Sequence, residues 1–436
     1  MNPSLRFSAT LASFLLLAGC DQGGHAKGPT TGSHPQIAAP GGSLLPVANF
    51  STAMPWPAGE HPSAPAGFTV TRYAEKLDHP RWLYVLPNGD VLVAEATTVE
   101  GPVKSLQDVA QKFLERNNGS VGASANRITL LRDSKSSGTV DTRTIFLSHL
   151  NQPFGMALIA NNFYVGNTDG VWRYPYAPGE TAIAGTGKRI LDLPAGGYNN
   201  HWTRNLYAGA DGKTLYVTVG SGSNIGENGA ANEFHRADIL QINPDGTGLR
   251  VFASGTRNPN GLEREPSTGT MWAVVNERDM LGEDLVPDYF TRVRDGDFYG
   301  WPYSYWGQHV DSRVTPQRPD LVARALTPDY ALGAHVAPLG LAFYTGTAFP
   351  ARYRGGAFIG EHGSWNRSEY SGYKVVYVPF AKGMPSGQPQ DFLTGFLHDP
   401  KAGIAYGRPV GLAVDRTGAL LVADDTGGII WRVAAK

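Results

Sequence analysis

One histidine stands in a turn of small and polar residues, where its side chain could take a proton from a bound molecule. His201 follows a run of glycine, tyrosine and asparagine at residues 196–200 and precedes a β-rich stretch. Imidazole titrates near neutral pH, which suits it to act as a general base. We therefore take His201 as the candidate base, beside the simpler reading that it is a satisfied structural histidine.

An arginine and an asparagine form a second candidate group within residues 255–262. Arg257 presents a fixed fork of donors, suited to a carboxylate or to an oxygen that gains negative charge, and Asn258 can both donate and accept beside it. The alternative is an ordinary turn, in which Asn258 and the glycines set backbone angles and Arg257 is solvated.

Two further groups carry charge. The first is an acidic loop at residues 275–284, whose carboxylate and carbonyl oxygens are ligands that calcium prefers, although it lacks the EF-hand pattern and a solvated loop is an equal alternative. The second comprises His362 with Arg367, and Arg408 further on. If Arg367 and Arg408 face the same cavity as Arg257, the cavity favours a small polyanion.

A recurring phrase indicates which elements position these side chains. A short step, often Pro-x-Gly-Leu, is followed a few residues later by a β-rich run, and the step occurs six times, at residues 80–83, 153–156, 203–206, 259–262, 338–341 and 409–412. A repeat of about 50 to 80 residues with several short strands is typical of propeller blades. We predict an all-β, six-bladed β-propeller with its chemistry in the central channel.

The composition agrees with a single all-β domain at residues 67–436. The chain has 436 residues, with 54 glycines and 31 prolines, so turns are abundant. Alternating patterns at residues 68–73 and 428–433 predict that the two ends pair within one blade. Residues 105–116 have helical spacing and predict an insertion in the first blade. The aromatic stretch at 301–334 either walls a sugar site or packs between blades.

The N-terminal region predicts export and anchoring. Residues 1–19 carry Arg6 and an apolar stretch too short to span a bilayer, as in a signal peptide. The following Cys20 completes a segment that resembles a bacterial lipobox, so we expect lipidation at Cys20 on the periplasmic side of a membrane; an ordinary secretory signal is the alternative. Cys20 is the only cysteine, which excludes disulfides. Residues 20–66 predict a disordered tether.

The net charge of −1 and the absence of a long basic run exclude a nucleic-acid partner of the usual electrostatic kind. A small, neutral molecule is the more plausible partner, and the membrane is contacted only through the lipid anchor.

Together, these segments resemble the soluble quinoprotein sugar dehydrogenase and sorbosone dehydrogenase family, which uses pyrroloquinoline quinone in a six-bladed propeller. The resemblance runs from about residue 67 to residue 433. Its motifs, each weak singly, occur in the family's order: His201 ahead of residues 215–220, then residues 257–262, 276–279, 299–302, 362–367 and 407–411.

The resemblance implies an oxidoreductase that acts on a sugar or a sugar-derived aldehyde. In that family, the counterpart of His201 takes a proton from the substrate hydroxyl while hydride passes to the quinone. Arg257 and Asn258 would steady the quinone oxygen as it gains charge. The electron acceptor that reoxidises the quinone is not indicated by any motif.

The resemblance also implies ligands for the cofactors. Calcium, held partly by backbone carbonyls near Glu277 and Arg278, would polarise the quinone. The cofactor's carboxylates would be bound by Arg408 and by either Arg367 or His362.

Two departures from the family leave other classes open. Ser221 stands where sugar dehydrogenases of this group carry an aspartate, and no lysine precedes Lys374 in the loop where the family places its lysine contact. A calcium-dependent propeller lactonase or esterase is one alternative, although its ring of inward carboxylates is replaced here by arginines. A non-catalytic propeller lipoprotein that binds a ligand is the other.

Overall fold

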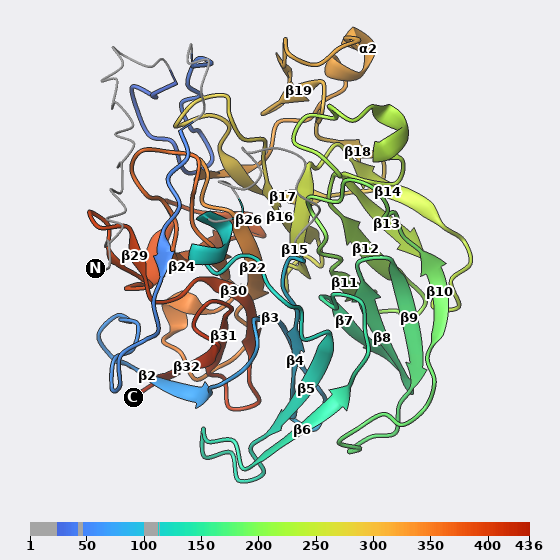
Figure 1. Ribbon diagram of the computed structural model, residues 1–436, viewed down its shortest axis with the longest axis vertical. Helices are drawn as coiled ribbons and strands as arrows, with labels where there is room; N and C mark the ends of the chain where they lie inside the picture. The colour runs from blue at the N-terminus through green and yellow to red at the C-terminus, as the bar shows by residue number, and fades with distance from the viewer. Residues whose placement is uncertain (1–23, 42–46, 100–111, 113) are drawn as a thin grey trace, which may run out of the picture.

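The computed structural model describes residues 24–41, 47–99, 112 and 114–436. Six sheets of four or five strands hold most of this part of the chain (Figure 1). The first sheet contains β3 (Pro80–Val85), β4 (Val91–Glu95), β5 (Arg127–Arg132) and β6 (Thr142–Leu147). The second contains β7 (Met156–Ile159), β8 (Asn162–Asn167), β9 (Gly170–Pro175) and β10 (Lys188–Asp192).

The third sheet contains β11 (Leu206–Ala208), β12 (Leu215–Val219), β13 (Asp238–Ile242) and β14 (Arg250–Ser254), with β18 (Asp297–Phe298) added in parallel. The fourth contains β15 (Asn258–Arg264), β16 (Met271–Asn276), β17 (Asp288–Val293) and β21 (Tyr330–Gly333). The fifth contains β22 (Pro338–Phe343), β23 (Ala357–Glu361), β24 (Lys374–Val378) and β27 (Gln390–Leu393).

The sixth sheet joins the two ends of the described chain. It contains β30 (Pro409–Val414), β31 (Leu420–Asp424), β32 (Ile429–Ala435) and β2 (Phe68–Ala74). Strand β2 pairs antiparallel with β32, so that Phe68 lies opposite Ala435 and Val70 opposite Val433. The prediction that both ends pair within one sheet is confirmed.

The remaining elements are short. Strand β1 (Thr52–Ala53) pairs with β29 (Ile404–Ala405), which also pairs with β28 (Leu397–Asp399). Two hairpins are formed by β19 (Ser304–Tyr305) with β20 (His309–Val310) and by β25 (Phe380–Ala381) with β26 (Met384–Pro385). Helical turns occur at η1 (Ala230–Glu233), α2 (Pro319–Val322) and η2 (Ala351–Tyr353). The described residues contain no helix with the length and apolar character needed to cross a membrane.

The first strands of the six sheets form a ring. Contacts run from β3 to β7, then to β11, β15, β22 and β30, and from β30 back to β3. Figure 1 shows these strands gathered around the centre, with β6, β10 and β14 farther out. The described chain is therefore nearly all β and propeller-like, as predicted.

The glycine of the recurring phrase explains how neighbouring first strands approach so closely. A Cβ atom at Gly340 would lie 2.0 Å from the carbonyl oxygen of Val410 on the next first strand. The glycines at 155, 261 and 411 meet the next first strand in the same way, with 2.2, 2.6 and 2.7 Å to its nearest atoms. In the four copies that carry a glycine at this position, the ring thus leaves no room for a side chain there.

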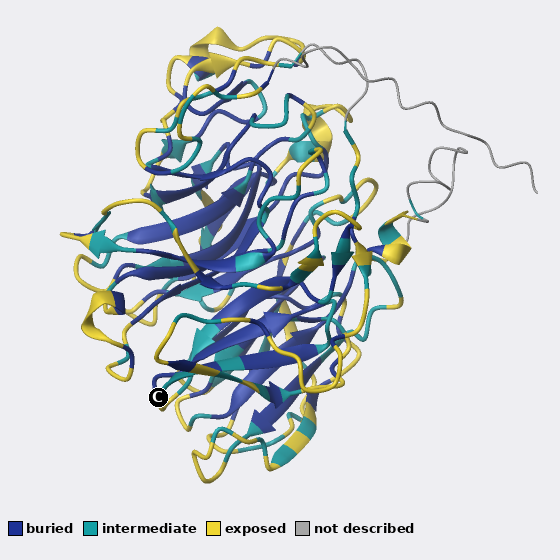
Figure 2. Ribbon diagram, turned by 90° about the vertical axis from the view of Figure 1, so that its left-hand side faces the viewer, coloured by how far each residue is buried: buried dark blue, intermediate teal, exposed yellow. Residues whose placement is uncertain are grey.

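The core is divided into layers between adjacent sheets, as Figure 2 shows by the buried strands inside a rim of exposed loops. One layer joins Leu83 and Val93 of the first sheet to Leu421 and Ile430 of the sixth, and others repeat this pattern around the ring. The second strands are buried on both faces because a layer packs on each side, which accounts for apolar runs such as Leu215–Val219.

The prediction that residues 20–66 form a disordered tether is wrong for the described residues 24–41 and 47–66. Gly32 pairs with Ala331, β1 pairs with β29, and the buried Trp56 donates its indole N–H to Asp424 at 2.8 Å. Composition averaged over the segment favoured disorder, but a few anchoring side chains and backbone pairs are sufficient to hold it against the sheets.

The remaining expectations concern the N-terminal signal, the predicted helix and the aromatic stretch. The signal segment 1–19 and Cys20 lie outside the described residues, as does most of the predicted helix at 105–116, of which residues 112 and 114–116 are helical. In the aromatic stretch, Tyr305 and Trp306 are buried in the core layer that includes Tyr289. These two rings therefore pack between structural elements rather than walling a sugar site.

Candidate active site

His201 lies in the loop before β11, and its hydrogen bonds define which ring nitrogen is available. Its Nδ1 atom is 2.9 Å from both the carbonyl oxygen and the hydroxyl oxygen of Ser221. The carbonyl can only accept, and the Ser221 hydroxyl donates its own proton to the carbonyl of Ser223 at 2.6 Å. We assign the proton to Nδ1 on these partners, so the neutral ring presents a lone pair at Nε2.

The surroundings of His201 keep the ring neutral. Burial lowers the pKa of His201 well below its ordinary value, the positive charge of Arg257 lowers it further, and the hydrogen bond with Ser221 opposes both effects. A neutral imidazole with an unprotonated Nε2 can accept a proton at neutral pH. Among the described residues no carboxylate contacts the ring, and Ser221 orients it.

Asn258 lies beside His201, as predicted. Gly220 lies between them, and a Cβ atom at this glycine would be 2.4 Å from Oδ1 of Asn258 and 2.6 Å from Cβ of His201. The Oδ1 atom of Asn258 is buried and accepts no hydrogen bond from the described residues. A buried amide oxygen without a partner is costly, so this atom is suited to a bound molecule that carries a donor.

Arg257 is close to the same place but is held by the protein. It donates to the carbonyl of Glu277 at 2.6 Å, to the backbone and side chain of Asn224, and to Asp279 at 3.0 Å. Asp279 lies 3.6 Å from Nδ1 of His335, a buried histidine that the sequence analysis did not select. The guanidinium therefore provides a fixed positive charge next to His201.

A second polar group contains His362 and Arg408, which are brought together as predicted. His362 contacts Asp425 at 3.0 Å, and Arg81 forms an ion pair with the same carboxylate. Burial and the charge of Arg408 lower the pKa of His362 to about 4, against the opposing effect of Asp425. Arg81 also lies over the ring of Trp202, 5.5 Å from its centroid, which connects this group to the loop of His201.

The guanidinium of Arg408 is mostly engaged by the protein. It donates to the carbonyls of His362 and Gly363, both at 2.9 Å, and to Asn118 and Ser120 at 2.6 and 3.1 Å. Four of its five N–H groups are thus used. Arg81 is the freer cation, because its buried Nε atom donates to none of the described residues.

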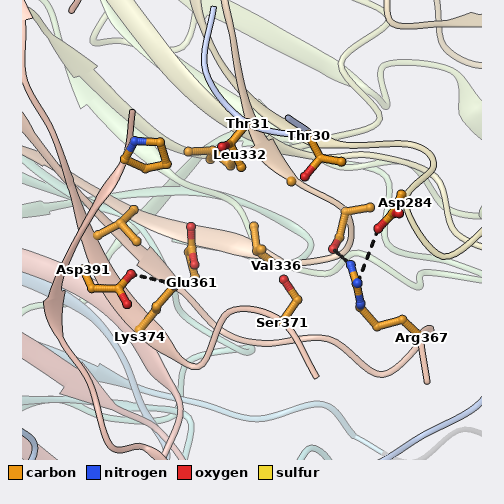
Figure 3. A pocket seen from close by; sticks show the side chains of 14 residues that line it. Thr30, Thr31, Asp284, Leu332, Val336, Glu361, Arg367, Ser371, Lys374 and Asp391 are labelled. Atoms are coloured by element: carbon orange, nitrogen blue, oxygen red, sulfur yellow. Dashed lines mark hydrogen bonds and ion pairs between the residues drawn. The ribbon is translucent and has the colours of Figure 1, made fainter. Parts of the chain in front are cut away.

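Arg367 does not join this group. It donates to the carbonyl of Ala334 at 2.8 Å, pairs with Asp284 at 3.3 Å, and lines a cavity with Glu361 and Lys374 (Figure 3). His201, Asn258 and Arg408 do not line that cavity. The predicted convergence of Arg257, Arg367 and Arg408 on one cavity is therefore not seen.

One of the predicted calcium ligands, the carbonyl of Glu277, is engaged by another partner. The carbonyl of Glu277 accepts from Arg257, and its carboxylate accepts from the backbone N–H of Arg278 at 2.8 Å. The Arg278 side chain forms a buried ion pair with Asp311. Within the part of the chain that the structure describes, no cluster of three acidic, histidine or cysteine side chains is arranged to hold a metal.

Sequence reasoning missed Arg81, His335 and Asp425, and it included Asp279 in the acidic loop without indicating its pairing with Arg257. Arg81 occupies the second position of the recurring phrase, where the other copies carry Phe154, Arg204, Asn260, Leu339 and Val410, so the phrase gives no distinct signal for it. Asp279 pairs with the predicted Arg257, and Asp425 contacts the predicted His362 as well as Arg81; only the folded chain shows these pairings.

The comparisons with known proteins agree with this arrangement. A family model described as glucose / sorbosone dehydrogenase matches residues 77–365, and one described as TrAA12-like matches residues 316–436. An uncharacterized protein of Borreliella burgdorferi is 32% identical over 243 residues, which cover 55% of this chain and 62% of that protein. The pyrroloquinoline quinone-dependent pyranose dehydrogenase of Coprinopsis cinerea is 26% identical over 346 residues, covering 64% of this chain and 44% of that protein.

One solved structure shares the fold over most of the chain. It is the holo form of the pyranose dehydrogenase PQQ domain from Coprinopsis cinerea, with a TM-score of 0.69 and 20% identity, covering 87% of this chain and 98% of that one. At this identity the likeness shows the fold alone. The chain spans less than two thirds of the length of the Borreliella and full-length Coprinopsis relatives.

Proposed function

Because the chain belongs to the glucose / sorbosone dehydrogenase family, we propose that it oxidises a small sugar or a sugar-derived aldehyde or hemiacetal, with pyrroloquinoline quinone as cofactor. The carrying observation is that Ser221 engages Nδ1 of His201, which leaves Nε2 to take a proton beside the buried, unpartnered amide oxygen of Asn258. When bound, the quinone supplies the acceptor for the hydride that leaves the sugar carbon.

The residues of this chain would act as follows. His201 accepts the proton of the substrate hydroxyl at Nε2 while Ser221 holds Nδ1. Asn258 offers its amide to the bound molecule, and Arg257 stabilises negative charge that develops nearby. The unpartnered Nε of Arg81 and the amide oxygen of Asn258 fit a flat cofactor that carries both acceptor and donor groups. His362 and Arg408 position Arg81 through Asp425 and the surrounding backbone.

Calcium does not fit its predicted ligands as they stand. The Glu277 carbonyl is hydrogen-bonded to Arg257, and the guanidinium of Arg278 donates to the Asp279 carbonyl at 2.9 Å. Each carbonyl oxygen keeps a second lone pair, but the guanidinium groups of Arg257 and Arg278 beside these oxygens would repel a cation. Calcium therefore remains part of the proposal as the ion that accompanies the quinone, with no step of the reaction assigned to it.

The test is to incubate the purified protein with calcium and pyrroloquinoline quinone and to follow reduction of an artificial electron acceptor with aldoses and sugar aldehydes. We expect turnover, and we expect His201→Asn to lower kcat by about 10²- to 10⁴-fold while the protein still binds the quinone. Unchanged turnover in this variant would contradict the role of His201. Hydrolysis of lactones without quinone would indicate a lactonase, and quinone binding without turnover would indicate a binding protein.

We also propose that the six sheets are the six blades of a propeller and that the chain is anchored by a lipid on Cys20 at the periplasmic side of a bacterial membrane. The first rests on the ring of first strands, and the second on the sequence of residues 1–20 alone. Cys20→Ala is expected to move the protein from the membrane fraction to the soluble fraction. If the variant fractionates like the parent, the anchor is disproved.

A further inference from the structure

The cavity that Arg367 lines has a volume of about 220 Å³ and lies between the fourth and fifth sheets, beside Thr30 and Thr31 of the N-terminal segment (Figure 3). Its walls mix apolar side chains, among them Leu332, Val336 and Val376, with polar groups from several elements. At about 30 Å³ per water molecule, this volume corresponds to about seven waters, which is the size of a small organic molecule. Such mixed walls favour a ligand with both C–H and hydroxyl surfaces.

The carboxyl group of Glu361 is the feature of this cavity that favours binding of a ligand, because one of its oxygens has no hydrogen-bond partner within the described part of the chain. Glu361 is 1% exposed, and its Oε2 atom accepts no hydrogen bond from any described residue. Figure 3 shows the side chain in the middle of the lining residues. A buried carboxyl oxygen without a partner is costly to maintain, so a donor from a bound molecule would relieve a penalty of the free protein.

Among three matched positions of the repeat, only Glu361 has a carboxyl oxygen without a hydrogen-bond partner in the described chain. Glu361 ends a second strand and pairs with Pro338 of the first strand, and Glu95 and Asp424 occupy the same place, opposite Pro80 and Pro409. All three residues are therefore matched positions of the fold, and their hydrogen bonds can be compared directly.

The two matched carboxylates are satisfied by the protein. Glu95 accepts from Arg127 at 3.0 and 2.7 Å, from the backbone N–H of Asp78 at 2.6 Å and from the hydroxyl of Thr129. Asp424 accepts from the indoles of Trp56 and Trp431 at 2.8 and 3.1 Å and from two backbone N–H groups.

Glu361 lacks the cross-strand partner that Glu95 has. Arg127 lies opposite Glu95 on the third strand and donates to it, and Lys374 lies opposite Glu361 in the same register. Lys374 instead donates to Asp391 on the next strand, at 2.6 Å. The chain therefore leaves the carboxyl group of Glu361 facing the cavity while a lysine that could satisfy it is engaged elsewhere.

The charges around the cavity narrow the class of ligand. An anion would face the carboxyl groups of Glu361, Asp284 and Asp391. A metal ion would face the cations Lys374 and Arg367, which already neutralise Asp391 and Asp284, and the described residues include no three-ligand metal cluster. A neutral molecule with several hydroxyl groups meets neither obstacle, and Ser371, Thr30 and Thr31 add hydroxyl partners at the wall.

We propose that this cavity binds a small, neutral polyhydroxylated molecule, a monosaccharide or polyol, through hydroxyl groups that donate to Glu361. The site is separate from the proposed catalytic group, because no residue of that group lines it. Binding of this kind needs neither the quinone nor turnover.

The test is calorimetric titration of the quinone-free protein with xylitol and, separately, with D-glucose. We expect at least one of them to bind, and Glu361→Gln to weaken that binding by about two- to tenfold, the effect of losing one uncharged hydrogen bond. Ser371→Leu, which places an apolar side chain at the wall, is expected to weaken it as well and serves if the glutamine variant does not fold.

Two controls separate this site from the others. Glu95→Gln makes the same change at a matched position whose carboxylate is satisfied by the protein, so it is expected to lower stability without changing the binding constant. His201→Asn is expected to leave this binding unchanged, and a loss there would place the sugar in the channel instead. Absence of binding by both probes, or binding that is indifferent to Glu361→Gln and Ser371→Leu, would overturn the proposal without bearing on the dehydrogenase reaction.

Discussion

At the scale of single residues, hydrogen bonds with Ser221 determine the orientation of the candidate base, His201. The carbonyl and hydroxyl oxygens of Ser221 hold Nδ1 of His201 in place. Many histidine bases are held by a carboxylate at this nitrogen instead. A neutral partner adds little basicity. The charge of Arg257 then lowers the pKa of His201 further, so the acidic limb of the pH–rate profile reports on Arg257.

This predicts an effect of Arg257→Gln on pH dependence as well as on rate. Removing a positive charge makes protonation of His201 easier, so its pKa rises and the acidic limb of kcat/KM moves to higher pH. We also expect kcat to fall by about 10²-fold, because stabilisation of developing charge is lost. The measurement is kcat/KM against pH for both proteins.

Arg367→Gln is the matched control for this prediction. It removes the same charge from an arginine that pairs with Asp284 and does not contribute to the pKa shift of His201. We expect its acidic limb to coincide with that of the parent. An Arg257→Gln profile with an unmoved or lowered acidic limb would show that Arg257 does not act electrostatically on His201.

At the scale of elements, the recurring phrase is a packing device. Its glycine lies where the first strand of one sheet meets the first strand of the next, and at Gly340 even a methyl group would collide with the backbone of Val410. The first and third copies carry Trp82 and Asn205 there. These side chains contact the next sheet instead. The rings of Trp82 and Phe154 lie with their centroids 4.8 Å apart, and Asn205 donates a hydrogen bond to the Asn260 carbonyl at 2.9 Å.

Gly340→Ala is therefore expected to destabilise the protein. An added methyl group in a closely packed place costs about 1–3 kcal/mol, because the neighbouring strand has to shift. Urea unfolding followed by tryptophan fluorescence measures the change.

Gly185→Ala makes the same substitution where no atom lies within 4 Å, and it should change stability by less than about 0.5 kcal/mol. If the two variants unfold at the same urea concentration, the close approach of the first strands is not what the phrase encodes.

At the scale of the whole molecule, the buried carboxyl groups couple stability to pH. Burial raises the pKa of Asp238, Asp288 and Glu361 to about 8, and that of Glu277 and Asp424 to about 7. Above their ordinary values near 4, the unfolded chain has released protons that the folded chain retains. Stability contributed by these groups is therefore lost as pH rises toward 8.

Buried histidines have the opposite effect, but only at lower pH. Burial lowers the pKa of His201, His335 and His362, so their contribution to stability increases up to about pH 6.5, where the unfolded chain loses its protons. Between pH 6.5 and 8 the carboxyl groups act alone, and each retained proton changes the free energy of unfolding by about 1.4 kcal/mol per pH unit.

We expect the free energy of unfolding in urea to be lower at pH 8 than at pH 6.5. Glu361→Gln should make that decrease shallower, because one retained proton is removed from the folded state. A protein that is as stable or more stable at pH 8 would contradict the assignment of these carboxyl groups as protonated in the folded state.

A large part of the fold and the central residues of the candidate site could be predicted from the sequence. The phrase and the paired ends are consequences of local order, because turn residues and alternation determine where strands begin and which face is buried. The placement of His201 with Arg257 and Asn258 in one site followed from the family resemblance. The same resemblance indicated that Ser221 stands near His201 in place of a carboxylate.

Contacts across the ring were decided only by the tertiary structure. The sequence did not indicate that the guanidinium of Arg408 would donate to Asn118 and neighbouring carbonyls, or that Arg367 would pair with Asp284. Nor did it indicate that Trp56 would hold the N-terminal segment in place through Asp424. These pairs join residues from 83 to 368 positions apart. Which long side chain finds which carboxylate depends on how six sheets close into one ring, and a local pattern holds no information about that closure.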